Sequence, residues 1–296
     1  SELCAMSAGG EGLVGGTMEE TLQRLNQCVQ DAKYFEAREG YKTLAQQHQP
    51  DAAEVLCSGA VAMLAHRQGE EGFELGMLLM DHLAAVDHDV SDRSVRRVHE
   101  VSDALRGGGE GMCRRHVKFL RAAVKWSQKG GVQGDEGLHL LLAMGHEAAG
   151  ELALALPHYA RSGTDAASSF ATALVSNSMR MTTDERELLA LRAVFLSLNV
   201  GRIDLAEALH KCCCASTQPN LLDAEGVRGN FCRQMLAACR RRAPPLFLML
   251  RSTYHKVHST EPTLREAVER IGESYFGVAA PRVGSKRAGE ASPRGD

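Results

Sequence analysis

Hydrophobic residues recur at three- and four-residue steps along most of the chain. Met18, Leu22, Leu25 and Val29 follow this spacing, and so does the later run 75–86. Such a period places apolar side chains along one side of an α-helix, whereas a strand alternates at every second residue. The ranges in which the pattern predicts a helix are 18–33, 34–47, 51–67, 72–86, 91–105, 112–128, 135–148, 151–161, 165–178, 183–199, 202–214, 229–242, 245–258 and 263–276.

Local signals support several of these helix starts. A threonine followed three residues later by a glutamate can form a capping box, in which each side chain binds a backbone amide that the helix leaves unpaired. The pairs with this spacing are Thr17 with Glu20, Thr182 with Glu185, and Thr263 with Glu266. Pro244 and Pro245 suit a first helical turn, where a missing N–H costs nothing.

Helices of this length joined by short turns pack antiparallel to their neighbours, and successive pairs stack on one another. The expected fold class is therefore all-α, an α-solenoid of stacked antiparallel helix pairs. The segment 34–41 (YFEAREGY) is typical of a tetratricopeptide helix, but its 34-residue consensus never repeats cleanly, so we expect degenerate tetratricopeptide-like repeats.

The predicted organisation is a single solenoid domain over 17–277, with an N-terminal half at 17–148 and a C-terminal half at 149–277. The flanking segments 1–16 and 278–296 are rich in small and polar residues, and we expect both to be disordered.

The composition narrows the classes of function. A net charge of -3 gives no general attraction to nucleic acid. No apolar run approaches the ~20 residues that span a bilayer, so direct membrane insertion is not expected. The start of the sequence lacks the pattern of a signal peptide, and the nine cysteines include no CxxC pair. These features predict a soluble protein of the cytosol whose cysteines act as small buried residues.

No motif predicts catalysis, a cofactor or a metal. His146 and Glu147 begin a zinc-protease pattern, but Gly150 stands where the second histidine is required. His139 and His146 can share a helix face without a third ligand in view. Trp126 is expected to fill a helix interface.

The cysteines leave one alternative open. Cys232 and Cys239 are spaced as core residues of a helix, and the run Cys212, Cys213 and Cys214 has no metal-site spacing. We expect a binding protein and not an enzyme. A thiol or metal enzyme that uses the Cys212–Cys214 run stays open as an alternative.

Several short segments together resemble the Golgi-to-ER traffic protein 4 family, the scaffold of the tail-anchored protein targeting pathway. They occur in the order found in that family, and similar spacing covers most of 18–282. The segments are 34–38 (YFEAR) with 41–44 (YKTL), 58–60 (SGA), 119–127 (FLRAAVKWS), 138–143 (LHLLLA) and 271–278 (IGESYFGV) followed by Pro281.

The resemblance implies a non-enzymatic adaptor that takes part in inserting tail-anchored proteins into the ER membrane. In the family, the N-terminal helix pairs bind the targeting ATPase and the C-terminal half binds a ubiquitin-like cochaperone. The residues implied on the ATPase face are Tyr34, Phe35, Arg38 and Glu74. Those implied on the cochaperone face are Phe231, Met235 and Phe247. The alternative function is a tetratricopeptide-like scaffold subunit of another intracellular assembly.

Overall fold

The computed structural model describes residues 17–86, 90–131, 133–215 and 220–278, and within them the chain forms only helices. Contacts divide the chain into two compact units, Ser1–Gly163 and Thr164–Asp296. The first unit contains α1 (Met18–Gln30), α2 (Tyr34–Gln47), η1 (Gln49–Asp51), α3 (Ala52–Ala65), α4 (Gly69–Val86), α5 (Asp92–Arg106), η2 (Glu110–Met112), α6 (Cys113–Ser127), η3 (Gln128–Gly130), α7 (Glu136–Ala148) and α8 (Leu152–Tyr159). The second contains η4 (Thr164–Ala166), α9 (Ala167–Ser178), α10 (Thr183–Asn199), α11 (Ile203–Ala215), α12 (Val227–Arg241), α13 (Pro244–Thr253), α14 (His255–Ser259) and α15 (Pro262–Phe276).

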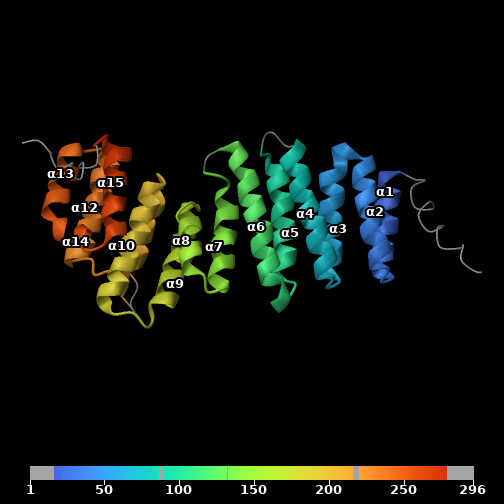
Figure 1. The fold of residues 1–296 in the computed structure, drawn as a ribbon, viewed down its shortest axis with the longest axis horizontal. Coiled ribbons are helices and arrows are strands. Elements are labelled where there is room, and N and C mark those ends of the chain that lie inside the picture. Colours follow the sequence, from blue (N-terminus) through green and yellow to red (C-terminus); the bar gives the residue numbers. More distant parts are fainter. Residues whose placement is uncertain (1–16, 87–89, 132, 216–219, 279–296) are drawn as a thin grey trace, which may run out of the picture. The chain divides into compact units, whose positions relative to one another are not determined.

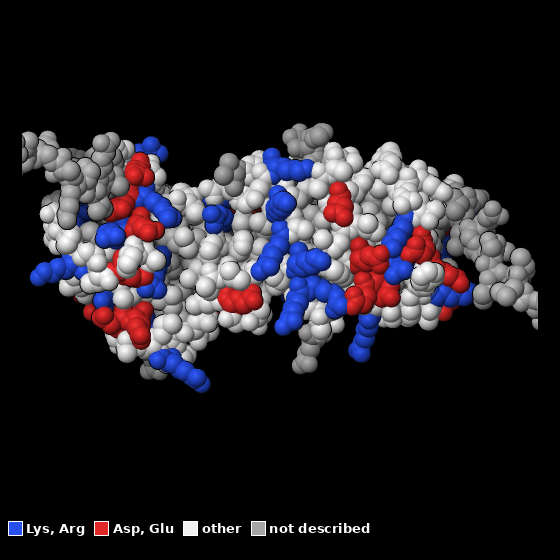
Figure 2. Space-filling model, in the orientation of Figure 1, with Lys and Arg blue, Asp and Glu red and all other residues white. Residues whose placement is uncertain are grey.

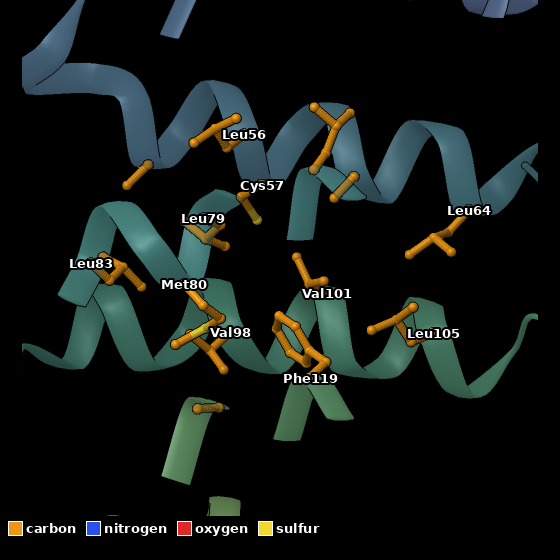
Figure 3. Packing of buried hydrophobic residues seen from close by; sticks show 14 of the residues in the cluster. Leu56, Cys57, Leu64, Leu79, Met80, Leu83, Val98, Val101, Leu105 and Phe119 are labelled. Carbon is orange, nitrogen blue, oxygen red and sulfur yellow. The ribbon is translucent and has the colours of Figure 1, made fainter. Parts of the chain in front are cut away.

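The first unit is a regular stack of antiparallel helix pairs (Figure 1). From α1 to α6, most helices pack against the next helix and against the helix after that, so that odd- and even-numbered helices form two layers. The core lies between the layers. In Figure 3, Leu79 of α4, Val98 and Val101 of α5 and Phe119 of α6 gather in this core, and all four are fully buried. Each apolar stripe of a helix is thus covered by its neighbours.

Tyr41 of α2 explains why a glycine stands in α3. The ring is fully buried and its hydroxyl donates a hydrogen bond of 2.7 Å to Asn26 Oδ1. Gly59 lies against the face of this ring, and a Cβ at that position would be 2.7 Å from Tyr41 Cγ. The missing side chain therefore lets α2 and α3 approach closely.

The second unit is built differently, because its last helix returns to an earlier one. α15 packs against α10, α13 and α14, while α12 packs against α10, α11 and α13. Aromatic rings fill the centre. Phe231 of α12 lies 5.5 Å from Phe195 of α10 and 4.8 Å from Tyr254, measured between ring centroids. Edge-to-face and stacked pairs of this kind add to the stabilisation from burial alone.

Most of the predicted helices are confirmed within a few residues, and so are two of the three predicted capping boxes, at Thr17 and Thr182. The capping box at Thr263 is wrong. Pro262 already occupies the first helical turn of α15 and Glu261 is the N-cap, so Thr263 lies inside the helix. Pro244 begins α13, in agreement with the prediction.

The single helix predicted over 245–258 is also wrong. The backbone leaves the helix at Tyr254, with φ -98° and ψ 22°, and α14 begins at the next residue. The Tyr254 ring stacks on Phe231 at this point. The break therefore coincides with a tertiary contact between α12 and the chain after α13.

The expected disordered segments fall outside the described residues, except for Val278. The two contact units do not divide where the expected halves do. α8 packs against α7, so it belongs to the first unit, and the division falls after Gly163 and not after residue 148.

Candidate functional site

Three of the four residues implied on the ATPase face come together at the surface of the first unit. Phe35 and Arg38 lie in the first turns of α2, and Glu74 lies in α4. Phe35 is 70% exposed, and the guanidinium carbon of Arg38 lies 5.2 Å from the centroid of its ring. Arg38 Nη1 donates a hydrogen bond of 3.1 Å to Glu74 Oε2. The structure thus forms an exposed aromatic ring flanked by a charged pair.

Two further charged residues extend this cluster. Lys42 Nζ lies 2.5 Å from Glu74 Oε1 and 3.1 Å from Glu39 Oε1, while Arg38 also contacts Glu39. The hydrogen bond from Lys42 is the main cause of a lowered pKa of Glu39, and Arg38 adds to it against the opposing effect of desolvation. All four charged side chains keep part of their surface in solvent.

We call Phe35, Arg38, Glu39, Lys42 and Glu74 the α2–α4 cluster. Partly exposed ion pairs add little to folding stability, about 0–1 kcal/mol each. A large exposed aromatic side chain also gains nothing from folding, because it stays in water. The network therefore does little for the fold. It holds Phe35 and two cations in one arrangement at the surface, which is what a docking surface requires.

Tyr34 is placed apart from this cluster. Its side chain is half-buried and packs against the core of the first unit, with its ring 6.5 Å from the imidazole of His66. Tyr34 thus supports the start of α2, whereas Phe35 projects into solvent.

The three residues implied on the cochaperone face lie in the core of the second unit. Phe231, Met235 and Phe247 have no exposed surface. Phe231 is enclosed by aromatic neighbours, and the Phe247 ring stacks on Phe276 at 4.7 Å. A direct contact with a partner needs exposed atoms, so these side chains do not offer one in this structure. Beside Phe247, the large exposed hydrophobic residues of α13 are Leu248 and Met249.

Sequence reasoning missed Lys42 and Glu39 in the first unit, and Leu248 and Met249 in the second. The spacing of Arg38 and Lys42, one helical turn apart, could have drawn attention to Lys42. No such signal distinguishes Leu248 from Phe247, because periodicity alone leaves adjacent apolar residues of a short helix equivalent.

His139 and His146 are buried, and the rings of both stack on the ring of His158. His139 Nδ1 lies 2.9 Å from His158 Nδ1, and His146 Nδ1 lies 2.7 Å from Glu151 Oε2. Burial is the main reason why the pKa of His158 falls to about 4, and the neighbouring His139 and His146 lower it further. No set of three potential ligands arranged for a metal ion occurs among the residues that the structure describes.

The cysteine run is split between buried and partly exposed positions. Cys213 is buried, which raises its pKa to about 12, and Cys212 and Cys214 lie at intermediate depth. Burial also raises the pKa of Cys232. Protonated thiols are weak nucleophiles, so Cys213 and Cys232 are packing residues.

Trp126 is 2% exposed in the core of the first unit, as expected. None of the described helices combines the length and apolarity needed to cross a membrane.

Comparisons with known proteins agree with this architecture. The sequence profile of the family described as Golgi to ER traffic protein 4 matches residues 46–289. The chain is 25% identical over 273 residues to the Golgi to ER traffic protein 4 homolog of Dictyostelium discoideum, covering 88% of this chain and 84% of the relative. It is 26% identical over 298 residues to Protein GET4 of Arabidopsis thaliana, covering 88% and 91%.

The fold is similar to that in the crystal structure of C. therm. Get4, with a TM-score of 0.76 and 21% identity over 92% of this chain and 93% of the other. That likeness confirms the expected all-α, solenoid-like class of fold. The profile match extends over well more than half of the chain and both relatives are covered almost fully. This protein therefore belongs to the Golgi to ER traffic protein 4 family.

Proposed function

We propose that the protein is an adaptor in the targeting of tail-anchored membrane proteins to the ER, acting in the cytosol and binding a targeting ATPase through the α2–α4 cluster. Membership of a family named for Golgi-to-ER traffic supports the pathway. The observation that carries the site is the exposed Phe35 ring, which Arg38 and Glu74 hold in one arrangement. Aromatic and arginine side chains dominate the binding energy at many protein interfaces.

The adaptor acts by proximity and makes or breaks no covalent bond. It holds the ATPase next to a ubiquitin-like cochaperone that delivers the client protein. Tethering of this kind raises the effective concentration of the second partner to about millimolar when the link is short.

For the cochaperone we propose the exposed side of α13 in the second unit. Leu248 is 42% exposed and Met249 is 54% exposed. They are adjacent on α13, and the buried Phe247 side chain packs this helix against the core of the second unit. Exposed apolar side chains on a rigid helix suit the apolar face of a partner. Replacing both Leu248 and Met249 by serine is expected to weaken binding of the cochaperone and to leave binding of the ATPase unchanged.

The ATPase site is tested by titrating the purified targeting ATPase with the Phe35→Ala variant. We expect binding about tenfold weaker, the equivalent of about 1.4 kcal/mol. Met179→Ala is the matched control, because Met179 is similarly exposed (66%) but lies in the second unit. Equal affinities of wild type and Phe35→Ala, with the circular dichroism spectrum unchanged, would remove the site assignment.

The alternative is a scaffold subunit of another intracellular assembly. Pull-down with the purified protein distinguishes the two. Recovery of a targeting ATPase or a ubiquitin-like protein favours the adaptor, and recovery of a different multisubunit complex without either favours the alternative.

A further inference from the structure

Helix α6 and its flanks carry side-chain charges of one sign only. Between residues 111 and 134 there are six lysines and arginines and no aspartate or glutamate, although the whole protein carries a net charge of -3. This bias is local, so it is a property of one surface and not of the molecule.

Four of the five lysines and arginines of α6 lie on a single side of the helix. Arg114, Lys118, Arg121 and Lys125 are exposed and follow one another at steps of four, three and four residues, while the opposite side is buried. At 1.5 Å per residue the row is roughly 16 Å long. We call these four residues the α6 row. Figure 2 shows lysine and arginine side chains gathered over the part of the first unit in which Figure 1 draws α5 and α6.

Ion pairs with described carboxylates are few along α6. Arg115, on the flank of the helix, pairs with Glu70. By contrast, the structure gives Arg114, Arg121 and Lys125 no ion pair with any described carboxylate. The exposed Arg240 of the second unit, by comparison, is paired with Glu207 and Asp204. Like charges in a row repel one another, so the row costs the folded protein some stability unless a ligand neutralises it.

An apolar strip borders the α6 row on the side of α4. Lys118 Nζ lies over the ring of Phe73, 5.6 Å from its centroid. Phe73, Met77 and Ala122 are half-buried and pack on the core of the first unit. Since α4 packs against α6, the surface combines a row of cations with partly exposed apolar side chains.

We propose that the α6 row and its apolar border bind an acidic amphipathic segment of a partner protein, a site separate from the α2–α4 cluster. Carboxylates at helical spacing match the four cations, and apolar side chains of the same segment match Phe73 and Met77. A nucleic-acid backbone matches the cations but supplies no apolar side chains for Phe73 and Met77. A lipid surface is distinguished by the test below.

The test uses a fluorescein-labelled helical peptide of about 20 residues made of glutamate, leucine and alanine, with glutamates and leucines on adjoining faces. Its fluorescence anisotropy is followed during titration with the full-length protein. We expect saturable binding that weakens about tenfold between about 0.05 M and about 0.3 M salt, because screening acts on exposed charges. A peptide of the same composition in scrambled order should bind at least several-fold more weakly.

The variant Arg114→Glu, Arg121→Glu, Lys125→Glu reverses three cations that form no ion pair with a described carboxylate, so no ion pair seen in the structure is lost. It should reduce peptide affinity by about tenfold or more. The matched control Arg241→Glu, Lys256→Glu, Arg265→Glu makes the same charge change at exposed positions of the second unit and should keep wild-type affinity. Phe35→Ala should also keep it, which separates this site from the proposed ATPase site.

Equal loss of peptide binding in the α6 variant and in the control would overturn the proposal, and so would equal affinity for the ordered and scrambled peptides. Two further probes, vesicles containing phosphatidylserine and a DNA duplex, are titrated in parallel. Binding of either one that depends on the α6 row, without binding of the ordered peptide, would also overturn it. Thermal unfolding followed by circular dichroism establishes that each variant is folded.

Discussion

The phenylalanines that were expected at binding surfaces lie in opposite surroundings in the two units. In the first, Phe35 lies 70% exposed at the start of a helix, and charged neighbours fix its position. In the second, Phe231 and Phe247 are fully enclosed and contact other rings. Both kinds of residue were expected at binding surfaces. The difference teaches that an aromatic residue in a helical repeat protein contributes either to a partner's binding or to the stability of its own unit, and burial decides which.

The largest effect is expected from Phe231→Ala. Removing a fully buried ring leaves a cavity, and we expect a loss of about 3–5 kcal/mol in the free energy of unfolding of the second unit. Urea denaturation measures the loss, and hydrogen exchange locates it. Exchange should rise in α9–α15 and stay unchanged in α1–α8. Phe119→Ala is the matched control, because Phe119 is fully buried in the first unit. For this variant, exchange should rise in α1–α8 and stay unchanged in α9–α15. A uniform rise in both units would contradict the division into two cores.

A smaller effect is expected from acid. Burial, with Arg106 nearby, lowers the pKa of His116 from 6.5 to about 4. The unfolded chain therefore takes up the proton first as the pH falls. The stabilisation is complete above about pH 6.5 and is lost between about 6.5 and 4, and we expect it to amount to about 1–2 kcal/mol, because the ring keeps some solvent contact.

Urea denaturation of the full-length protein at several pH values measures how the free energy of unfolding depends on pH. His116→Gln should reduce the slope, because glutamine can still bond to Ser102 but does not titrate. A slope that is the same in the variant would assign the pH dependence to other groups, such as His158.

The next effect is expected from Gly59→Ala. The added methyl group meets the Tyr41 ring at 2.7 Å, and overpacking of about 1–3 kcal/mol outweighs the helix-propensity gain of about 1 kcal/mol. A net loss of about 1 kcal/mol should appear in thermal unfolding. Gly111→Ala serves as the control, since nothing lies within 4 Å of its added Cβ. Equal melting temperatures of the two variants would mean that Tyr41 can move aside.

The smallest change in stability is expected from Phe35→Ala. The ring is in water in the folded state, so the free energy of unfolding should change by less than about 0.5 kcal/mol. Urea denaturation of this variant next to Phe231→Ala completes the comparison of exposed and enclosed rings. A loss above about 1 kcal/mol would mean that Phe35 belongs to the core of the first unit.

Much of the fold could be predicted from the sequence, because helical periodicity and caps such as Thr17 with Glu20 are local properties. The break at Tyr254 could not, since it coincides with packing against Phe231, which is distant in the sequence. The residues of the candidate sites also fall into some that could be predicted and some that could not. The resemblance suggested Arg38 with Glu74, and the structure places them 3.1 Å apart. Whether Phe247 or Leu248 faces solvent depends on how α15 covers α13, which no local pattern contains.

The return of α15 to α10 has a consequence for synthesis of the chain on the ribosome. Most helices of the first unit contact only near neighbours in sequence, so this unit can fold step by step as the chain emerges. The second unit cannot complete its core until residue 276 has left the exit tunnel, and until then α10 exposes the apolar surface that α15 will cover. The nascent second unit is therefore the part of the protein that most needs protection by a chaperone.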